Sequence, residues 1–144
     1  FSSCSKLTSV TIPNSVTSIG SSAFYGCSSL TSVTINSDAI VSEDYKYDDN
    51  ISDIFGSQVT EYIIGNHVKG IGFNAFSGCS ATSVTIGESV TSIGKYAFNE
   101  CSSLTSITCE ARTPPTLGLY ASGFACLQHI ILLCGCAFHS KIGT

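Results

Sequence analysis

Apolar residues recur along this chain at matching positions in five copies of one short template. Equivalent cysteines in the first two copies, Cys4 and Cys27, are 23 positions apart. The closely related copies are residues 1–12, 24–35, 76–93 and 98–109, and a fifth, longer turn lies between them. Such a period predicts a solenoid, in which each copy is one turn that buries its apolar residues only against neighbouring turns.

Within each turn, apolar and polar residues alternate over a short segment such as Ser32-Val33-Thr34-Ile35. This alternation predicts a β-strand with Val33 and Ile35 directed inward and Ser32 and Thr34 outward. We expect three inward rows, formed by Leu7, Leu30, Val59 and Leu104; by Val10, Val33, Tyr62, Val84 and Ile107; and by Ile12, Ile35, Ile64, Ile86 and Cys109.

A second apolar pair follows each strand after a polar corner, as in Val16 with Ile19. The residues after these pairs are Gly20, Gly72 and Gly94, which predicts a positive-φ turn or a close approach between turns. An Ala-Phe segment comes next and is too short for an independent helix, so we expect one helical or 3₁₀ turn there. Its phenylalanines, Phe24, Phe76 and Phe98, are predicted to fill the core.

One turn is longer than the others by about eight residues, around positions 37–54. Insertions in repeat proteins project as loops from one edge. We therefore predict two regions: a solenoid of about five turns over residues 1–117, and an atypical C-terminal tail over residues 118–144. The tail holds no Asp or Glu, and we interpret it as a non-native, out-of-frame, truncated or disordered end.

The chain begins within a repeat and contains no Met, so we expect it to be a fragment of a longer protein. Its net charge of −4 with only 6 Lys and Arg argues against nucleic acid as a partner. Four of the 8 cysteines share one repeat position, and Cys109 stands where other turns carry Ile. This pattern favours reduced thiols stacked in the interior. Disulfides between adjacent turns remain the alternative.

No motif for catalysis, a metal or a cofactor is recognisable. The acidic stretch that starts at Asp48 begins like a calcium loop, but Asp53 and Val59 stand where that loop needs Gly and Glu. Cys134 and Cys136 with His129 and His139 lack the paired spacing of a zinc module. The uncharged stretch 119–138 is interrupted by polar residues, which argues against a membrane span. We therefore predict that the chain is not an enzyme.

The outward strand positions predict a Ser/Thr ladder, which suits either a recognition surface or a solvated coat that resists aggregation. Glu61 and Ile63 interrupt the ladder. We predict a partner-binding patch there, together with Tyr45, Lys46 and Tyr47 of the adjoining insertion, because exposed aromatic residues are favoured anchors.

The units Phe24-Tyr-Gly-Cys27-Ser-Ser-Leu30-Thr-Ser-Val33-Thr-Ile35 and Ile12-Pro-Asn-Ser-Val16-Thr-Ser-Ile19-Gly20-Ser-Ser-Ala23-Phe24 closely resemble the BspA-like, Treponema-type leucine-rich repeats. The resemblance covers roughly residues 1–117. It implies a right-handed repeat solenoid with one short parallel strand per turn on one face, and with short strands and 3₁₀ or helical turns on the other.

The resemblance also implies a role. Bacterial members are secreted or cell-surface proteins that attach to host extracellular proteins or to other cells, so we expect a non-catalytic module for adhesion through a protein partner. Membrane association would come only through regions outside this chain. Two alternatives stay open: a structural spacer or stalk with no ligand of its own, and a repeat fragment attached to an enzyme domain.

Overall fold

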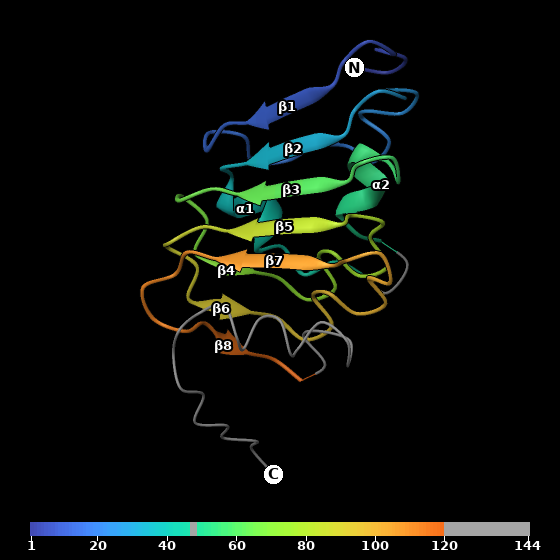
Figure 1. The fold of residues 1–144 in the computed structure, drawn as a ribbon. Helices are drawn as coiled ribbons and strands as arrows, with labels where there is room; N and C mark the ends of the chain where they lie inside the picture. The colour runs from blue at the N-terminus through green and yellow to red at the C-terminus, as the bar shows by residue number, and fades with distance from the viewer. Residues whose placement is uncertain (47–48, 120–144) are drawn as a thin grey trace.

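A computed structural model describes residues 1–46 and 49–119 of the chain. Five strands stack in parallel and in register to form one wall of the molecule, which we call the strand wall (Figure 1). Its strands, in spatial order, are β1 (Ser9–Ile12), β2 (Ser32–Ile35), β3 (Glu61–Ile64), β5 (Ser83–Ile86) and β7 (Ser106–Cys109). Each strand pairs with the strand of the next turn, as a solenoid requires.

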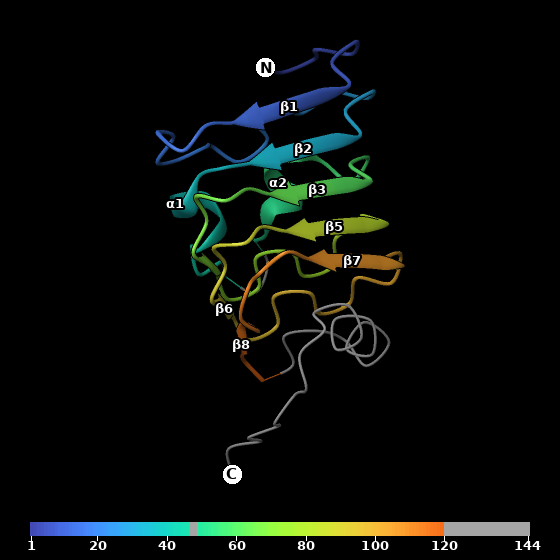
Figure 2. The ribbon, with the colours of Figure 1, turned by 60° about the vertical axis from the view of Figure 1, so that its left-hand side comes forward.

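A second, smaller parallel sheet forms the opposite side, which we call the back wall (Figure 2). It contains β4 (Gly70–Ile71), β6 (Ser92–Ile93) and β8 (Thr116–Leu117), in that order. Two short helices, α1 (Asp38–Val41) and α2 (Ile51–Phe55), belong to the insertion. The apolar side chains of both walls meet between them, so the core is one continuous column.

The predicted inward rows are confirmed. Val33, Tyr62, Val84 and Ile107 occupy equivalent register positions and are almost fully buried. Val10 is only half-buried because β1 has a strand neighbour on one side only. A threonine before each strand adds a second set of contacts between turns: the Thr82 hydroxyl, for example, donates to the Thr60 carbonyl oxygen at 3.1 Å.

The predicted phenylalanines form an aromatic column along the solenoid axis. Phe24, Phe76 and Phe98 are buried, and Phe55 fills the equivalent place in the longer turn. Ring centroids lie 5.0 Å apart for Phe24 and Phe55, 5.2 Å for Tyr62 and Phe76, and 5.3 Å for Phe76 and Phe98. These spacings lie within the range at which aromatic pairs attract one another.

Glycine and left-handed residues have separate roles in the turns. A Cβ on Gly94 would lie 2.7 Å from the Gly72 carbonyl carbon, so glycine is needed there for close approach of the backbones. Neither residue has a positive φ. The left-handed conformation falls two residues later, at Ser22 (φ 60°), Asn74 (φ 60°) and Tyr96 (φ 59°). Close approach was thus the correct alternative for Gly72 and Gly94, whereas Gly20 has neither a positive φ nor an atom within 4 Å of an added Cβ.

The Ala-Phe segments form successive hydrogen-bonded turns rather than a helix that continues beyond one turn. Ala23 N donates to Gly20 O at 3.2 Å, and Tyr25 N donates to Ser22 O at 3.0 Å. The insertion is more regular. Ser37 caps α1 and Asn50 caps α2, the latter with a reciprocal hydrogen bond from its backbone to Asp53.

All five described cysteines are thiols. Cys27 and Cys79 are buried as predicted, whereas Cys101 and Cys109 are half-buried. Cys4 is exposed, so the interior location was wrong for this residue, which lies in a turn with a neighbour on one side only. In the longer turn, Gln58 replaces the cysteine and donates to the carbonyl oxygens of Phe55 and Cys27 at 2.7 and 3.2 Å.

Candidate functional site

The outward face of the strand wall carries a ladder of small hydroxyl side chains that is interrupted at its middle strand. Eight of the ten outward positions are Ser or Thr: Ser9, Thr11, Ser32, Thr34, Ser83, Thr85, Ser106 and Thr108. Glu61 and Ile63 occupy the other two, on β3. The register places Ile63 between Thr34 and Thr85. The interruption therefore lies at the centre of the described face.

The Glu61 carboxylate is held in place on this face. Ser32 on the neighbouring strand donates to Glu61 Oε2 at 2.7 Å. Both residues are half-buried. Ile63 is also half-buried: the threonines on either side of it are shorter, so part of its side chain stays accessible. The centre of the wall thus combines an oriented negative charge with an accessible apolar side chain.

The insertion lies along the back wall, which corrects the expected position of the patch. Tyr45 N donates to Phe73 O at 2.9 Å, and Asp44 accepts from Phe73 N at 2.7 Å. Asp38 likewise accepts from Lys69 N at 2.7 Å, next to β4. Glu61 and Ile63 point outward from the opposite wall. The expectation that the insertion adjoins them was therefore wrong.

Tyr45 is packed inward rather than displayed. Its ring is half-buried against the core, and its hydroxyl donates to Ile40 O at 2.9 Å. Burial raises the pKa of this phenol well above its ordinary value, and the Glu43 charge adds to that rise. Lys46 is exposed. Tyr47 lies outside the described residues.

Asn74 fastens the insertion to the next turn. It is 4% exposed, and its side-chain amide nitrogen donates to Lys46 O at 2.9 Å and to Asp49 O at 3.1 Å. The two acceptors flank the short segment between them. One buried side chain thus holds both Lys46 and Asp49 against the next turn, and nothing in the sequence pattern indicated this role.

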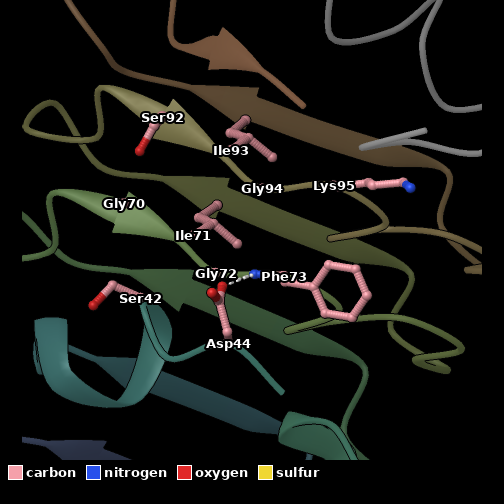
Figure 3. A pocket seen from close by; sticks show the side chains of 10 residues that line it. All are labelled: Ser42, Asp44, Gly70, Ile71, Gly72, Phe73, Ser92, Ile93, Gly94 and Lys95. Carbon is pink, nitrogen blue, oxygen red and sulfur yellow. Dashed lines mark hydrogen bonds between the residues drawn. The ribbon is translucent and has the colours of Figure 1, made fainter. Parts of the chain in front are cut away.

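An open hollow of about 390 Å³ lies on the back wall, where the insertion meets β4 and β6 (Figure 3). Its lining residues are Ser42, Asp44, Gly70, Ile71, Gly72, Phe73, Ser92, Ile93, Gly94 and Lys95. Three of these ten residues are glycines, which contribute only backbone to the lining. At one edge, Lys95 Nζ lies 4.8 Å from the centre of the Tyr96 ring, and that ring packs against Phe73 at 5.8 Å. Sequence reasoning missed this hollow, although its glycines were the available signal.

Within residues 1–46 and 49–119, no group of three or more His, Cys, Asp or Glu is placed to hold a metal ion. The same residues include no helix that is long and apolar enough to cross a bilayer. The cysteine and histidine cluster considered at Cys134, Cys136, His129 and His139, and the apolar stretch 119–138 beyond its first residue, lie outside the described residues.

Each coil of the chain contributes one parallel strand, short connections join the coils, and an aromatic column fills the core. This arrangement defines a leucine-rich-repeat-type solenoid. The family comparison agrees, and the chain belongs to the BspA type leucine-rich repeat family, whose model matches six copies over residues 1–55 and 52–133. The match therefore extends beyond residue 117. In the structure, regular contacts between turns also continue to Leu119, whose carbonyl oxygen accepts from Tyr96 N at 3.3 Å.

No curated protein and no solved structure matches the chain. Leucine-rich repeats generally mediate protein–protein interaction and are typically non-catalytic. Members of the BspA type are typically associated with the cell surface.

Proposed function

We propose that this chain is a non-catalytic module that binds a protein partner through the strand wall, with Glu61 and Ile63 at the centre of the contact. The single observation that carries the proposal is the interruption of the Ser/Thr ladder at β3. Four of the five strands carry the outward pair Ser and Thr, so the exceptional pair is a local property of one strand.

The chemistry of the two side chains supports a contact of this kind. Ile63 supplies apolar area that is removed from water when a partner covers it, at about 25 cal/mol per Å². Glu61 is already oriented by Ser32, so less side-chain freedom is lost when a cationic group of the partner pairs with it. The surrounding hydroxyls form a polar rim, as in many protein interfaces.

The insertion offers a second, separate contact on the back wall. Tyr45 is half-buried there, so we assign the contact on this wall to Lys46 and, as a proposal from the sequence alone, to Tyr47, whereas Tyr45 packs against the core. Two contacts on opposite walls would need a partner that wraps around the solenoid, or two partners. The strand wall is therefore the primary site.

Family membership supports the cellular role that we propose. The module would belong to a secreted or cell-surface protein of a bacterium and would attach to a host extracellular protein or to a protein on another cell. Family analogy alone does not assign a partner, because one fold serves many functions.

The test converts the exceptional strand into an ordinary one. In the double variant E61S/I63T, β3 carries the same outward pair as its four neighbours, so the backbone and the inward residues stay unchanged. Wild type is first screened by surface plasmon resonance against immobilised extracellular-matrix and cell-surface proteins. For any saturable binder, the double variant should bind at least about tenfold more weakly, which corresponds to about 1.4 kcal/mol.

Two controls separate the walls. S106A/T108S changes the outward pair of β7 at the end of the strand wall and should leave the affinity within about twofold of wild type, well below the tenfold step. K46A tests the insertion. Unchanged affinity in E61S/I63T, together with a loss in K46A, would move the site to the back wall and contradict the strand-wall proposal.

A structural spacer is the second candidate, and the uniform Ser/Thr pair on four strands favours it. A spacer would show no saturable binding to any protein of the panel. An attached enzyme domain, the third possibility, has no observation in its favour within residues 1–46 and 49–119.

A further inference from the structure

Two cysteines of adjacent turns lie close enough for their sulfurs to touch. Cys79 Sγ and Cys101 Sγ are 3.2 Å apart, and Cys101 Sγ also lies 2.9 Å from Phe76 O. We propose that Cys79 and Cys101 are an oxidation site at which a thiol-disulfide reagent introduces a covalent bond between the two turns. The bond would join the turn before β5 to the turn before β7.

The backbone already has the spacing that such a bond needs. Phe76 N donates to Ala97 O at 2.8 Å and Gly78 N donates to Asn99 O at 2.7 Å, so the two turns are hydrogen-bonded directly before both cysteines. Neighbouring strands held in this way are about 4.8 Å apart, and disulfide-bonded residues have Cα atoms about 4.4–6.8 Å apart. Turns held at such a spacing would let the bond form by rotation of the two side chains.

The other described cysteines are less well placed. The longer turn separates Cys27 from Cys79 and carries Gln58 at the cysteine position. Cys27 Sγ instead lies 3.1 Å from Phe1 O. The repeat pattern alone makes all cysteines equivalent, so the distinction between these pairs comes from the structure.

The two thiols differ in a way that suits a stepwise reaction. Cys101 is half-buried and so can meet a reagent, whereas Cys79 is 2% exposed. The hydrogen bond with Cys101 lowers the pKa of the Cys79 thiol, and burial opposes this shift. That hydrogen bond exists only while Cys101 carries its proton, so the second exchange depends on the 3.2 Å contact between the two sulfurs rather than on the lowered pKa.

With oxidised glutathione as the oxidant, the reaction balances in two exchanges. The Cys101 thiolate attacks one glutathione sulfur, forms a mixed disulfide and releases one glutathione thiolate. The Cys79 thiolate then attacks the Cys101 sulfur, forms the bond between the turns and expels the second glutathione thiolate. The two cysteine thiols lose two protons and two electrons in total: the glutathione disulfide accepts the electrons, and the two thiolates that it yields accept the protons.

Trypsin places the two cysteines on different peptides, 70–95 and 96–112. After incubation of the full chain with oxidised glutathione and blocking of the remaining thiols, non-reducing mass spectrometry should find these peptides linked, with a mass lower by two hydrogen atoms than their sum. Fragmentation distinguishes Cys101 from Cys109 on the second peptide. Because oxidised glutathione can react with any free cysteine, the experiment is repeated with Cys126, Cys134 and Cys136 all replaced by Ser.

Thermal unfolding gives an independent readout. Oxidation should raise the midpoint of wild type and of C109S, whereas C79S and C101S should show no rise. Because the linked peptides are measured on wild type, the inference stays testable even if a variant folds poorly. A Cys101–glutathione adduct that persists without the linked peptides would overturn it, and so would a link through Cys109.

Discussion

Asn74 is the residue at which the structure gives the sharpest quantitative prediction. Its side chain donates two hydrogen bonds to the insertion, and its backbone has φ of 60°. Removal of two buried hydrogen bonds costs about 2 kcal/mol, at roughly 1 kcal/mol each. A non-glycine side chain without the local hydrogen bonding of Asn adds about 1 kcal/mol in the left-handed region. N74A should therefore lower the free energy of unfolding by about 3 kcal/mol.

A glycine variant separates the two contributions. N74G loses the hydrogen bonds but adopts positive φ without the steric cost, so it should be about 1 kcal/mol more stable than N74A. Ser22 provides the matched control, because it has the same φ of 60° in another turn and an exposed side chain. S22A keeps a Cβ in the same conformation and removes no contact with the insertion, so it should be close to neutral.

Urea unfolding followed by circular dichroism measures these differences, and hydrogen exchange shows where they arise. The amide of Ile51, which donates to Ala75 O at 2.9 Å, should exchange faster in N74A than in S22A. Equal destabilisation by N74A and S22A, with unchanged exchange at Ile51, would show that Asn74 does not fasten the insertion.

Three further predictions concern the core and the back wall. The Tyr62 hydroxyl is buried without a hydrogen-bond partner of good geometry among the described residues, although an interaction with Ser52 slightly offsets the rise of its pKa that burial causes. Y62F should therefore raise the free energy of unfolding, measured in urea, by about 1–2 kcal/mol. A decrease of that size would show that the hydroxyl is hydrogen-bonded. Burial also raises the pKa of Tyr62 and Tyr45 in the folded state, so these tyrosines lose their protons at a lower pH in the unfolded chain than in the folded chain. The free energy of unfolding in urea should therefore fall as the pH rises above about 10. The fall should be shallower in Y62F, and an equal fall would contradict the raised pKa of Tyr62. G94A forces a Cβ against the Gly72 backbone, so it should lower the melting temperature and reduce the free energy of unfolding by about 1–3 kcal/mol. In G20A the added Cβ meets no atom within 4 Å, so this variant should be close to neutral. Similar effects of the two variants would refute the close-approach role of Gly94.

The inward rows and the aromatic column were predictable because every turn uses the same positions for the same purpose. Val33, Val84 and Phe76 stand at repeat positions whose burial depends only on the neighbouring turns. Tyr62 follows the same rule although its side chain is much larger, because register fixes its direction.

The position of the insertion was also encoded, but in chain order rather than in composition. The insertion comes after the strand Ser32–Ile35 and before Phe55, and in the next turn the same interval contains the back-wall strand Gly70–Ile71. The insertion was predicted to adjoin Glu61 because the two are near each other along the chain. Glu61 belongs to the strand wall, however, whereas this interval of the turn belongs to the back wall. The contacts of Asn74 could not be predicted, because they depend on the path of an irregular loop.

The cysteine pair shows a similar limit. Repeat position predicts that Cys79 and Cys101 are neighbours, but it predicts the same for Cys4 and Cys27. Exposure and rotamer distinguish the two pairs, and both depend on where each turn lies in the stack.

The central claim is that successive turns stack in parallel register, so that equivalent inward residues touch across turns. Methyl-labelled solution NMR tests it most directly. The account predicts nuclear Overhauser effects from Val84 to the Tyr62 ring on one side and to Ile107 on the other, and from Ile64 to both Ile35 and Ile86. Contacts of Val84 confined to its own turn, or strong effects between α-protons of paired strands as in antiparallel sheets, would contradict the account.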